Sequence, residues 1–163
     1  MEVINIIKGE KDMNKYMLFA IEEARTGIRN GHGGPFGCVI VKGEEVVGRG
    51  HNQVILNNDP TCHGEMQAIR DACKKLGTFD LSGCTLYTTG EPCPMCFWAI
   101  LWANIEKVYY GCNVLDTEDI GFRDNKFYNL PEEEKKKFST CLDREECLKL
   151  YEEYKNIEDK KEY

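Results

Sequence analysis

Residues 85–110 decide the fold and read TLYTTGEPCPMCFWAILWANIEKVYY. Residues 85–89 and 107–110 are short stretches rich in β-branched and aromatic side chains, a composition typical of strands. Residues 92–103, between them, carry a helical pattern of apolar residues. Only a few residues separate one element from the next. The stretch therefore predicts a compact α/β alternation.

The same alternation continues toward the amino terminus. Apolar residues recur at helical spacing from Met13 to Ile28, and Gly31 is the expected stop of that helix. Two apolar runs, residues 36–41 and 45–49, flank the turn Lys42-Gly43-Glu44. Such a pair predicts a β-hairpin.

A second helix is expected over about residues 62–76. Turn-forming residues occupy positions 57–60 just before it. Thr61 can cap this helix, because a threonine hydroxyl accepts the free amides of a first helical turn.

Patterns weaken in the last third of the chain. Residues 111–128 are expected to form a polar loop, and Pro131 with the acids that follow it predicts a helix start. Asp143 and Glu146 resemble a capping box ahead of a final helix. The charged residues 152–163 are, by themselves, typical of a solvated end.

Length and charge limit the possible functions. The chain has 163 residues and a formal net charge of -7, which fits one domain over residues 1–163. Phosphate contacts need clustered Lys and Arg, so the acidic balance argues against nucleic acid and favours a small, uncharged or modestly polar substrate. No apolar run reaches the roughly 18 residues of a membrane span.

Cysteine usage indicates the compartment. Nine cysteines would suggest disulfides in a secreted protein. The count is odd, however, and residues 1–5 lack the basic and apolar regions of a signal peptide. We therefore expect a soluble protein of the reducing cytoplasm.

Two motifs at expected helix starts carry the chemistry. Together they match the H-x-E and P-C-x-x-C signature of zinc deaminases, and they read His63-Gly64-Glu65 and Pro92-Cys93-Pro94-Met95-Cys96. His63, Cys93 and Cys96 would leave the fourth zinc position open for water, as a catalytic site requires. Cysteines at i and i+3 of a first helical turn can face one point, where the amide ends favour thiolate.

Glu65 is the expected proton carrier. It lies two residues from His63 and is not itself a ligand. Zinc lowers the pKa of a bound water to about 7, so no strong base is needed. We interpret Glu65 as taking a proton from this water and giving it to a ring nitrogen, while the oxygen attacks the amine-bearing carbon and ammonia leaves.

Other interpretations of the cysteines stay open at this point. A lone C-x-x-C is also typical of a redox pair or of half a structural zinc site. A structural site needs a fourth ligand, for which Cys84 and Cys112 are candidates. Each stands near an expected strand, which favours burial as a small apolar residue. His32 and His51 lack ligand spacing and are expected to be surface or hydrogen-bonding residues.

Flanking residues resemble the cytidine and deoxycytidylate deaminase superfamily, and within it the bacterial guanine deaminases, over nearly the whole chain. The matching segments are Gly33-Gly34-Pro35-Phe36-Gly37, Asn58-Asp59-Pro60-Thr61, Glu91-Pro92-Cys93-Pro94-Met95-Cys96, Gly121-Phe122 and Lys160-Lys161-Glu162-Tyr163. This resemblance implies a three-layer α/β sandwich with a central five-stranded mixed sheet, one zinc ion per subunit and a homodimer. It also implies that about residues 130–163 exchange between subunits, so that Tyr163 caps the partner's active site.

The resemblance implies roles for further residues. Asn52 would hydrogen-bond a purine and Phe36 would stack on it. Asp124 would be a second acid near the leaving amine. Trp102 would form a pocket wall, and the backbone amide of Gly64 could touch the substrate. Glu91 would brace the turn before Cys93.

This sequence departs from the family pattern at two positions. Gly64 and Cys38 occupy positions where alanine is usual. Gly64 removes a methyl group, which predicts a slightly roomier pocket or a more flexible helix start. The resemblance implies that the substrate is the free base guanine. A change in the shape of the pocket at Gly64 could alter which substrate fits.

Several substrates remain compatible with the same metal chemistry. Guanosine, cytosine, cytidine and an aminated triazine are alternatives, because the shape of the pocket decides among them. A tRNA adenosine deaminase is a further alternative. It needs a basic surface for an anticodon loop, whereas acids cluster here at residues 132–134, 145–146 and 152–153.

Overall fold

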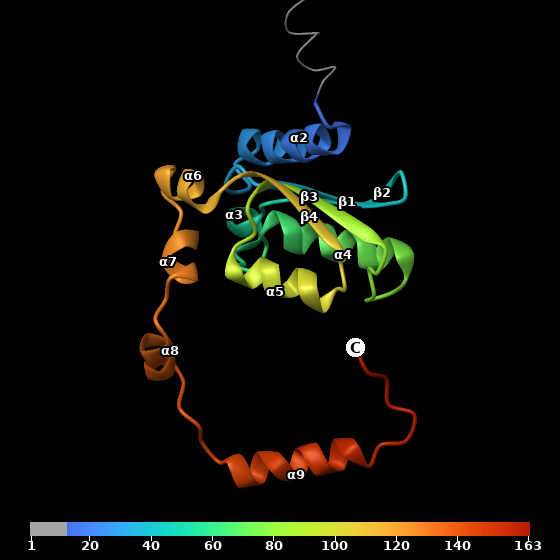
Figure 1. The fold of residues 1–163 in the computed structure, drawn as a ribbon, viewed down its shortest axis with the longest axis vertical. Helices are drawn as coiled ribbons and strands as arrows, with labels where there is room; N and C mark the ends of the chain where they lie inside the picture. Colours follow the sequence, from blue (N-terminus) through green and yellow to red (C-terminus); the bar gives the residue numbers. More distant parts are fainter. Residues whose placement is uncertain (1–12) are drawn as a thin grey trace, which may run out of the picture.

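The computed structural model describes residues 13–163. A mixed sheet forms the middle layer of an α/β body and is covered by helices on both faces (Figure 1). Residues 1–5, on which the expected lack of a signal peptide rests, lie outside the described residues. Within the described part of the chain, no helix has the length and hydropathy needed to cross a bilayer.

The sheet has four strands in the order β2-β1-β3-β4. They are β1 (Gly37–Lys42), β2 (Glu45–His51), β3 (Cys84–Gly90) and β4 (Lys107–Cys112). β1 is antiparallel to β2 and β3, whereas β3 and β4 run parallel. The predicted hairpin and both later strands are confirmed within two residues at each end.

Helices cover both faces of the sheet. The first is α2 (Lys15–Arg29), which Asn14 caps by accepting the amides of Tyr16 and Met17. α4 (Gly64–Leu76) and α5 (Pro94–Trp102) lie on the opposite face (Figure 1). The fully buried side chains between the layers include Ile40, Leu81, Leu86 and Ile100.

The start of α4 differs from the prediction. Its N-cap is His63, not Thr61, and no side chain caps it. Thr61 instead donates from its hydroxyl to Asp59 at 2.7 Å. The side chain of Thr61 is thus occupied in the preceding turn, and a short helix, α3 (Val54–Asn57), precedes that turn.

The prediction of a polar loop after β4 is wrong, because residues 111–128 contain α6 (Val114–Asp119) and α7 (Asp124–Tyr128). Asn113 and Asp116 form a capping box at the start of α6, with an aspartate where the usual pattern has Glu or Gln. These helices lead the chain away from β4. Among residues 13–163 there is accordingly no fifth strand. The resemblance implied a sheet of five strands, whereas the sheet in this structure has four strands.

The last two helices extend away from the α/β body (Figure 1). They are α8 (Glu132–Phe138) and α9 (Arg144–Lys155), and neither contains a buried residue. The expected helix starts are confirmed, but Asp143 caps α9 without a side-chain hydrogen bond, because its backbone is left-handed with φ of 52°. The chain then returns toward the body, where its end lies near α5 (Figure 1).

Candidate active site

The structure brings His63, Cys93 and Cys96 together where α4 and α5 begin. Cys93 is the N-cap of α5 and His63 the N-cap of α4. The Nδ1 atom of His63 lies 3.5 Å from the Sγ of Cys93 and 3.6 Å from the Sγ of Cys96. One imidazole nitrogen and two sulfurs, all within 4.8 Å of one another, suit a tetrahedral zinc ion with one open position.

Hydrogen bonding within this cluster favours a thiolate. The Cys96 thiol donates to Cys93, and this bond, together with the one from His63, lowers the pKa of Cys93 to about 4. The pKa of Cys96 is raised, because it keeps the proton that the two sulfurs share. The bond to Cys93 also raises the pKa of His63. Metals bind the deprotonated thiol, so Cys93 is ready to bind a metal ion, whereas Cys96 would release its proton on binding.

Neither candidate for a fourth cysteine ligand belongs to this cluster. Cys84 is fully buried, as expected. Cys112 is exposed, so the prediction of its burial is wrong, because β4 forms the edge of the sheet. The geometry therefore supports the three-ligand interpretation over a structural site with four ligands.

Glu65 lies beside the cluster at the second position of α4, and only 5% of it is exposed. Its Oε1 atom accepts a hydrogen bond of 3.0 Å from the Thr88 hydroxyl on β3. Burial raises the pKa of Glu65, because a charged carboxylate loses its hydration. The carboxyl group thus holds its proton to a higher pH than an exposed glutamate does.

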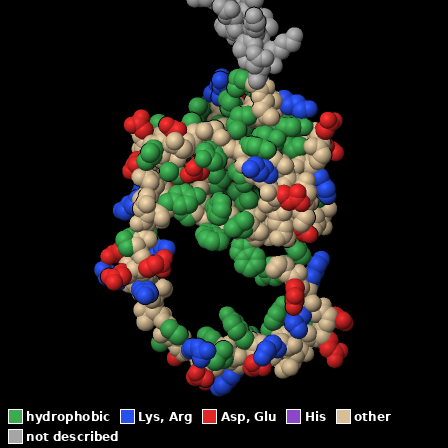
Figure 2. Space-filling model, in the orientation of Figure 1, with side chains coloured by type: hydrophobic (Ala, Val, Ile, Leu, Met, Phe, Trp, Pro, Cys, Tyr) green, Lys and Arg blue, Asp and Glu red, His purple; other side chains and the backbone are tan. Residues whose placement is uncertain are grey.

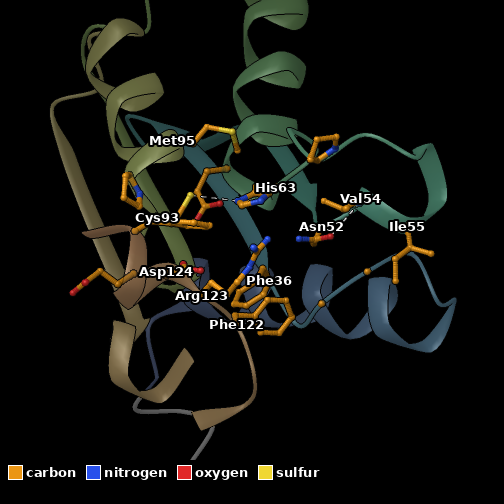
Figure 3. A pocket seen from close by; sticks show the side chains of 17 residues that line it. Phe36, Asn52, Val54, Ile55, His63, Cys93, Met95, Phe122, Arg123 and Asp124 are labelled. Carbon is orange, nitrogen blue, oxygen red and sulfur yellow. Dashed lines mark hydrogen bonds between the residues drawn. The ribbon is translucent and has the colours of Figure 1, made fainter. Parts of the chain in front are cut away.

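A single pocket of about 640 Å³ contains the expected metal ligands His63 and Cys93 together with Glu65 (Figure 3). Its size falls in the usual range for small-molecule sites. Phe36, Asn52 and Asp124 also line it. These substrate and acid candidates come from segments far apart in the sequence.

The apolar side of the pocket is aromatic. Phe36 and Phe122 make an edge-to-face contact, with ring centroids 4.8 Å apart and planes at 83°. On another side, the Oδ1 atom of Asn52 accepts the backbone N–H of Val54 at 3.1 Å. Because Oδ1 is engaged, the amide nitrogen of Asn52 is the group left to donate to a ligand.

Asp124 begins α7 and is partly buried in the pocket wall. Burial raises its pKa, and the negative charge of Cys93 adds to the effect. The adjacent Arg123 extends its side chain into the pocket between Phe36 and Asp124 (Figure 3). Sequence reasoning missed Arg123, because a charged residue in an expected loop gives no sign of the direction in which it points.

The turn that carries Cys93 is held from two sides. The backbone N–H of Glu91 donates to the Cys112 carbonyl at 2.7 Å. The hydroxyl of Tyr128, on α7, donates to the Pro92 carbonyl. Burial raises the pKa of Tyr128 to about 12, so this hydroxyl keeps its proton for the bond. Tyr128 was also missed, since an aromatic residue near a chain turn has no distinctive spacing.

Trp102 and Tyr163 do not line this pocket. Trp102 is 66% exposed at the end of α5. The ring of Tyr163 lies 6.0 Å from that of Trp102 and 6.0 Å from that of Phe79, measured between centroids. The structure thus places Trp102 next to Tyr163, but it places neither in the pocket of their own chain.

The position of Gly64 does not favour a roomier pocket, which was one of the two expectations for this residue. A Cβ atom at this position would lie 3.0 Å from the Phe36 carbonyl oxygen and 3.3 Å from its carbon. The absent methyl group would therefore face the backbone before β1 instead of the cavity. Cys38, the other departure, is fully buried, and burial raises the pKa of its thiol well above the usual range.

Comparisons with known proteins agree with this geometry. Residues 10–112 match the family model described as the cytidine and deoxycytidylate deaminase zinc-binding region. Guanine deaminase of Bacillus subtilis (strain 168) is 42% identical over 147 residues, which cover 88% of this chain and 94% of that protein. An X-ray structure of the Bacillus subtilis guanine deaminase matches with a TM-score of 0.83 and 41% identity, over 93% of this chain and 99% of that chain.

Two further relatives match over shorter stretches. The tRNA-specific adenosine deaminase of Aquifex aeolicus (strain VF5) is 43% identical over 95 residues, or 58% of this chain and 62% of that protein. A structure of guanine deaminase from Nitrosomonas europaea matches with a TM-score of 0.62 and 32% identity, over 66% of this chain and 62% of that chain. The chain belongs to the cytidine and deoxycytidylate deaminase family.

Proposed function

We propose that this protein is a zinc-dependent aminohydrolase that converts guanine and water to xanthine and ammonia. The observation that carries the proposal is the single pocket in which Glu65 lies beside the His63, Cys93 and Cys96 cluster. The match to guanine deaminase over 94% of that protein's length supports guanine as the substrate. We propose one zinc ion per subunit.

The chain's own groups would move the protons. Bound at the cluster, zinc supplies a Lewis acid that lowers the pKa of water. Glu65 accepts a proton from the attacking water and delivers it to the ring nitrogen next to the amine-bearing carbon. Asp124, whose pKa is raised by burial, donates a proton to the departing amine. The carbon–nitrogen bond breaks and ammonia leaves. The remaining proton of the attacking oxygen then returns to Asp124, so that this oxygen becomes the new carbonyl oxygen of xanthine and both carboxyl groups recover their starting state.

The pocket walls suit a guanine ring. Phe36 offers an aromatic face for stacking, and the Asn52 amide offers a donor for a ring nitrogen. The Arg123 guanidinium, which points into the pocket, can donate to two adjacent acceptors (Figure 3). Guanine presents such a pair in O6 and N7, whereas adenine has an amine in place of O6. One similar solved structure, with 33% identity and a TM-score of 0.64, is a complex with 8-azaguanine.

We propose that the active enzyme is a homodimer in which about residues 130–163 of each chain contact the partner. Helix α5 supports this, because its exposed apolar side chains would otherwise face water; these are Phe97, Trp98, Leu101 and Trp102. Hydrophobic side chains gather over this part of the body and face the opening toward α9 (Figure 2). In such a dimer Trp102 and Tyr163, which lie together, would reach the partner's pocket as one group.

The proposed compartment is the cytoplasm. All nine cysteines are free. Thiols persist in a reducing compartment, whereas secreted chains rich in cysteine form disulfides.

A substrate panel tests the proposed function. We expect the purified, zinc-loaded protein to release ammonia from guanine much faster than from guanosine, cytosine, cytidine, adenine or an aminated triazine. A tRNA anticodon stem-loop with an unpaired adenosine completes the panel, and the Glu65→Gln variant measures the background. Cytidine or the stem-loop as the best substrate would overturn guanine as the substrate, and inactivity on every compound would overturn the proposed activity.

A further inference from the structure

A chain of three titratable side chains lies outside the metal cluster and beside the pocket. His51 ends β2 and is 9% exposed. Its Nδ1 atom lies 3.0 Å from the Oε2 atom of Glu23 on α2. Its Nε2 atom lies 2.8 Å from the Nδ1 atom of His32. The two imidazole planes differ by only 16°, and the ring centroids lie 5.1 Å apart.

The chemistry of these groups fixes the direction of the hydrogen bonds. A carboxylate only accepts, so the Nδ1 atom of His51 carries a proton and donates it to Glu23. In a neutral ring the Nε2 atom of His51 is then an acceptor, so the Nδ1 atom of His32 must donate to it. With both rings neutral, the hydrogen bonds therefore run from His32 through His51 to Glu23, and both imidazoles are in the Nδ1–H form.

His51 is joined directly to the base-binding side of the pocket. The next residue, Asn52, donates its backbone N–H to the Phe36 carbonyl at 2.8 Å. The Oδ1 atom of Asn52 accepts from Val54 at 3.1 Å, as described above. A Cβ atom at Gly33 would lie only 2.0 Å from that Oδ1, so the Gly33 backbone lies directly against Asn52.

His32 is joined to the same side through its backbone. Its carbonyl accepts the N–H groups of Ile55 and Leu56 at 3.0 and 3.1 Å, in the short helix α3. Ile55 lines the pocket. The two histidines thus connect Asn52 and α3, and Glu23 anchors both to α2.

The α2 side of this arrangement is tightly packed. A Cβ atom at Gly27 would lie 2.7 Å from the Cδ2 atom of His51, so the α2 backbone leaves the imidazole little room to move. Buried ionic and polar groups can often be replaced by apolar residues without loss of stability. A fully hydrogen-bonded network, in contrast, specifies one arrangement of the groups attached to it.

We propose that Glu23, His51 and His32 form a positioning chain that sets Asn52 and α3 for binding of the base. The inference rests on the proposed function, because the bound base is the purine proposed above. These residues contact neither the reacting carbon nor the metal ligands. They act through Asn52, and their effect should appear in KM and in ligand affinity more than in kcat, since a small misplacement of a binding group weakens binding.

The kinetics of paired variants test the positioning chain. We expect His51→Leu to raise the KM for guanine and the Kd for 8-azaguanine by about tenfold, the value of one lost hydrogen bond of good geometry, with kcat changed less than about threefold. Zinc content should stay at the wild-type level. His51→Gln should recover most of the affinity, because a Gln amide can donate to Glu23 and accept from His32.

Glu23, the carboxylate end of the positioning chain, can be compared with a matched control residue on the same helix, α2. Glu23→Leu should raise KM as His51→Leu does, whereas Glu23→Gln keeps an acceptor oxygen and should stay near the wild type. Glu22→Leu is the control, because Glu22 is the next residue on α2 but has a 59% exposed side chain. The melting temperature of each variant separates a loss of positioning from a loss of fold.

Nuclear magnetic resonance of the imidazole nitrogens gives a readout that needs no variant. The chain has three histidines, of which His63 faces the thiols through Nδ1. We expect the other two to show the Nδ1–H form at neutral pH in the full-length zinc enzyme.

The following outcomes would overturn the positioning chain: an Nε2–H form of His51, an unchanged KM in Glu23→Leu, or a His51→Gln variant as impaired as His51→Leu. A wild-type protein inactive on guanine would instead overturn the proposed function, and the imidazole spectrum would still test the chain of hydrogen bonds.

Discussion

The Thr88 hydroxyl donates to the Oε1 atom of Glu65 across 3.0 Å, and both residues are buried. Burial raises the pKa of Glu65, whereas this hydrogen bond favours the ionised carboxylate and lowers it. The two effects oppose each other at the group that must both accept and release a proton. Thr88 is thus a positioning residue that also limits how far burial raises the pKa.

Removal of the Thr88 hydroxyl should shift the pH profile. In Thr88→Val the pKa of Glu65 should rise further, because the donor is lost and the burial remains. The base form then appears only at higher pH, so the acid limb of kcat/KM should move to higher pH, and kcat/KM at a fixed pH on that limb should fall about tenfold. Thr85→Val on the same strand is the control. An acid limb that stays in place would contradict this role.

Glu65 itself should be needed for turnover and not for zinc. Glu65→Gln keeps the size of the side chain but cannot carry the proton, so we expect kcat to fall by about a thousandfold or more. Zinc content, measured by atomic absorption, should match that of the wild type, because the ligand atoms of His63, Cys93 and Cys96 are unchanged. A Gln variant with full activity would refute the proton-transfer role.

Asp124 should act as an acid with a recognisable pH dependence. Burial raises its pKa, followed by the charge of Cys93, so the carboxyl group keeps its proton to a higher pH than usual. A proton donor is active when protonated, so kcat should fall as pH rises through this raised pKa. Asp124→Asn should lower kcat by about a hundredfold and abolish that fall. Asp119→Asn, at an exposed position on α6, should leave the profile unchanged.

Subunit mixing should show whether Tyr163 acts on the partner. A chain that ends at Asp159 should keep its zinc and lose affinity for guanine. The Glu65→Gln variant retains the tail but lacks turnover. If the tail acts in trans, mixed dimers of the two variants should recover activity that neither shows alone. If the activity is the same before and after mixing, and dimer exchange is verified, the tail does not act on the partner. Residues 152–163 would then be a solvated end.

The metal cluster and most of the fold could be predicted because their signals are local. His63, Cys93 and Cys96 occupy motifs of a few residues at helix starts, where spacing alone indicates that the side chains converge. The hairpin followed from two apolar runs around Gly43 for the same reason. Such patterns depend little on the rest of the molecule.

The remaining parts depend on contacts between distant segments. Glu23 and His51 are 28 residues apart and meet only because α2 packs against the hairpin. Cys112 could be assigned to a strand, but its exposure depends on β4 being the edge of the sheet. The direction of Arg123 depends on where α7 begins, and α6 was hidden by a capping box with Asp116 in place of the usual Glu or Gln.

The close approach of Gly64 to the Phe36 carbonyl couples the start of α4 to the aromatic side of the pocket. Alanine at position 64 requires the backbone before β1 to withdraw by a few tenths of an ångström. That backbone carries the aromatic ring proposed to hold the base. A mutation to alanine at position 64 should therefore be felt first at the ring of Phe36, as a change in binding of the base, and not at the metal ligands.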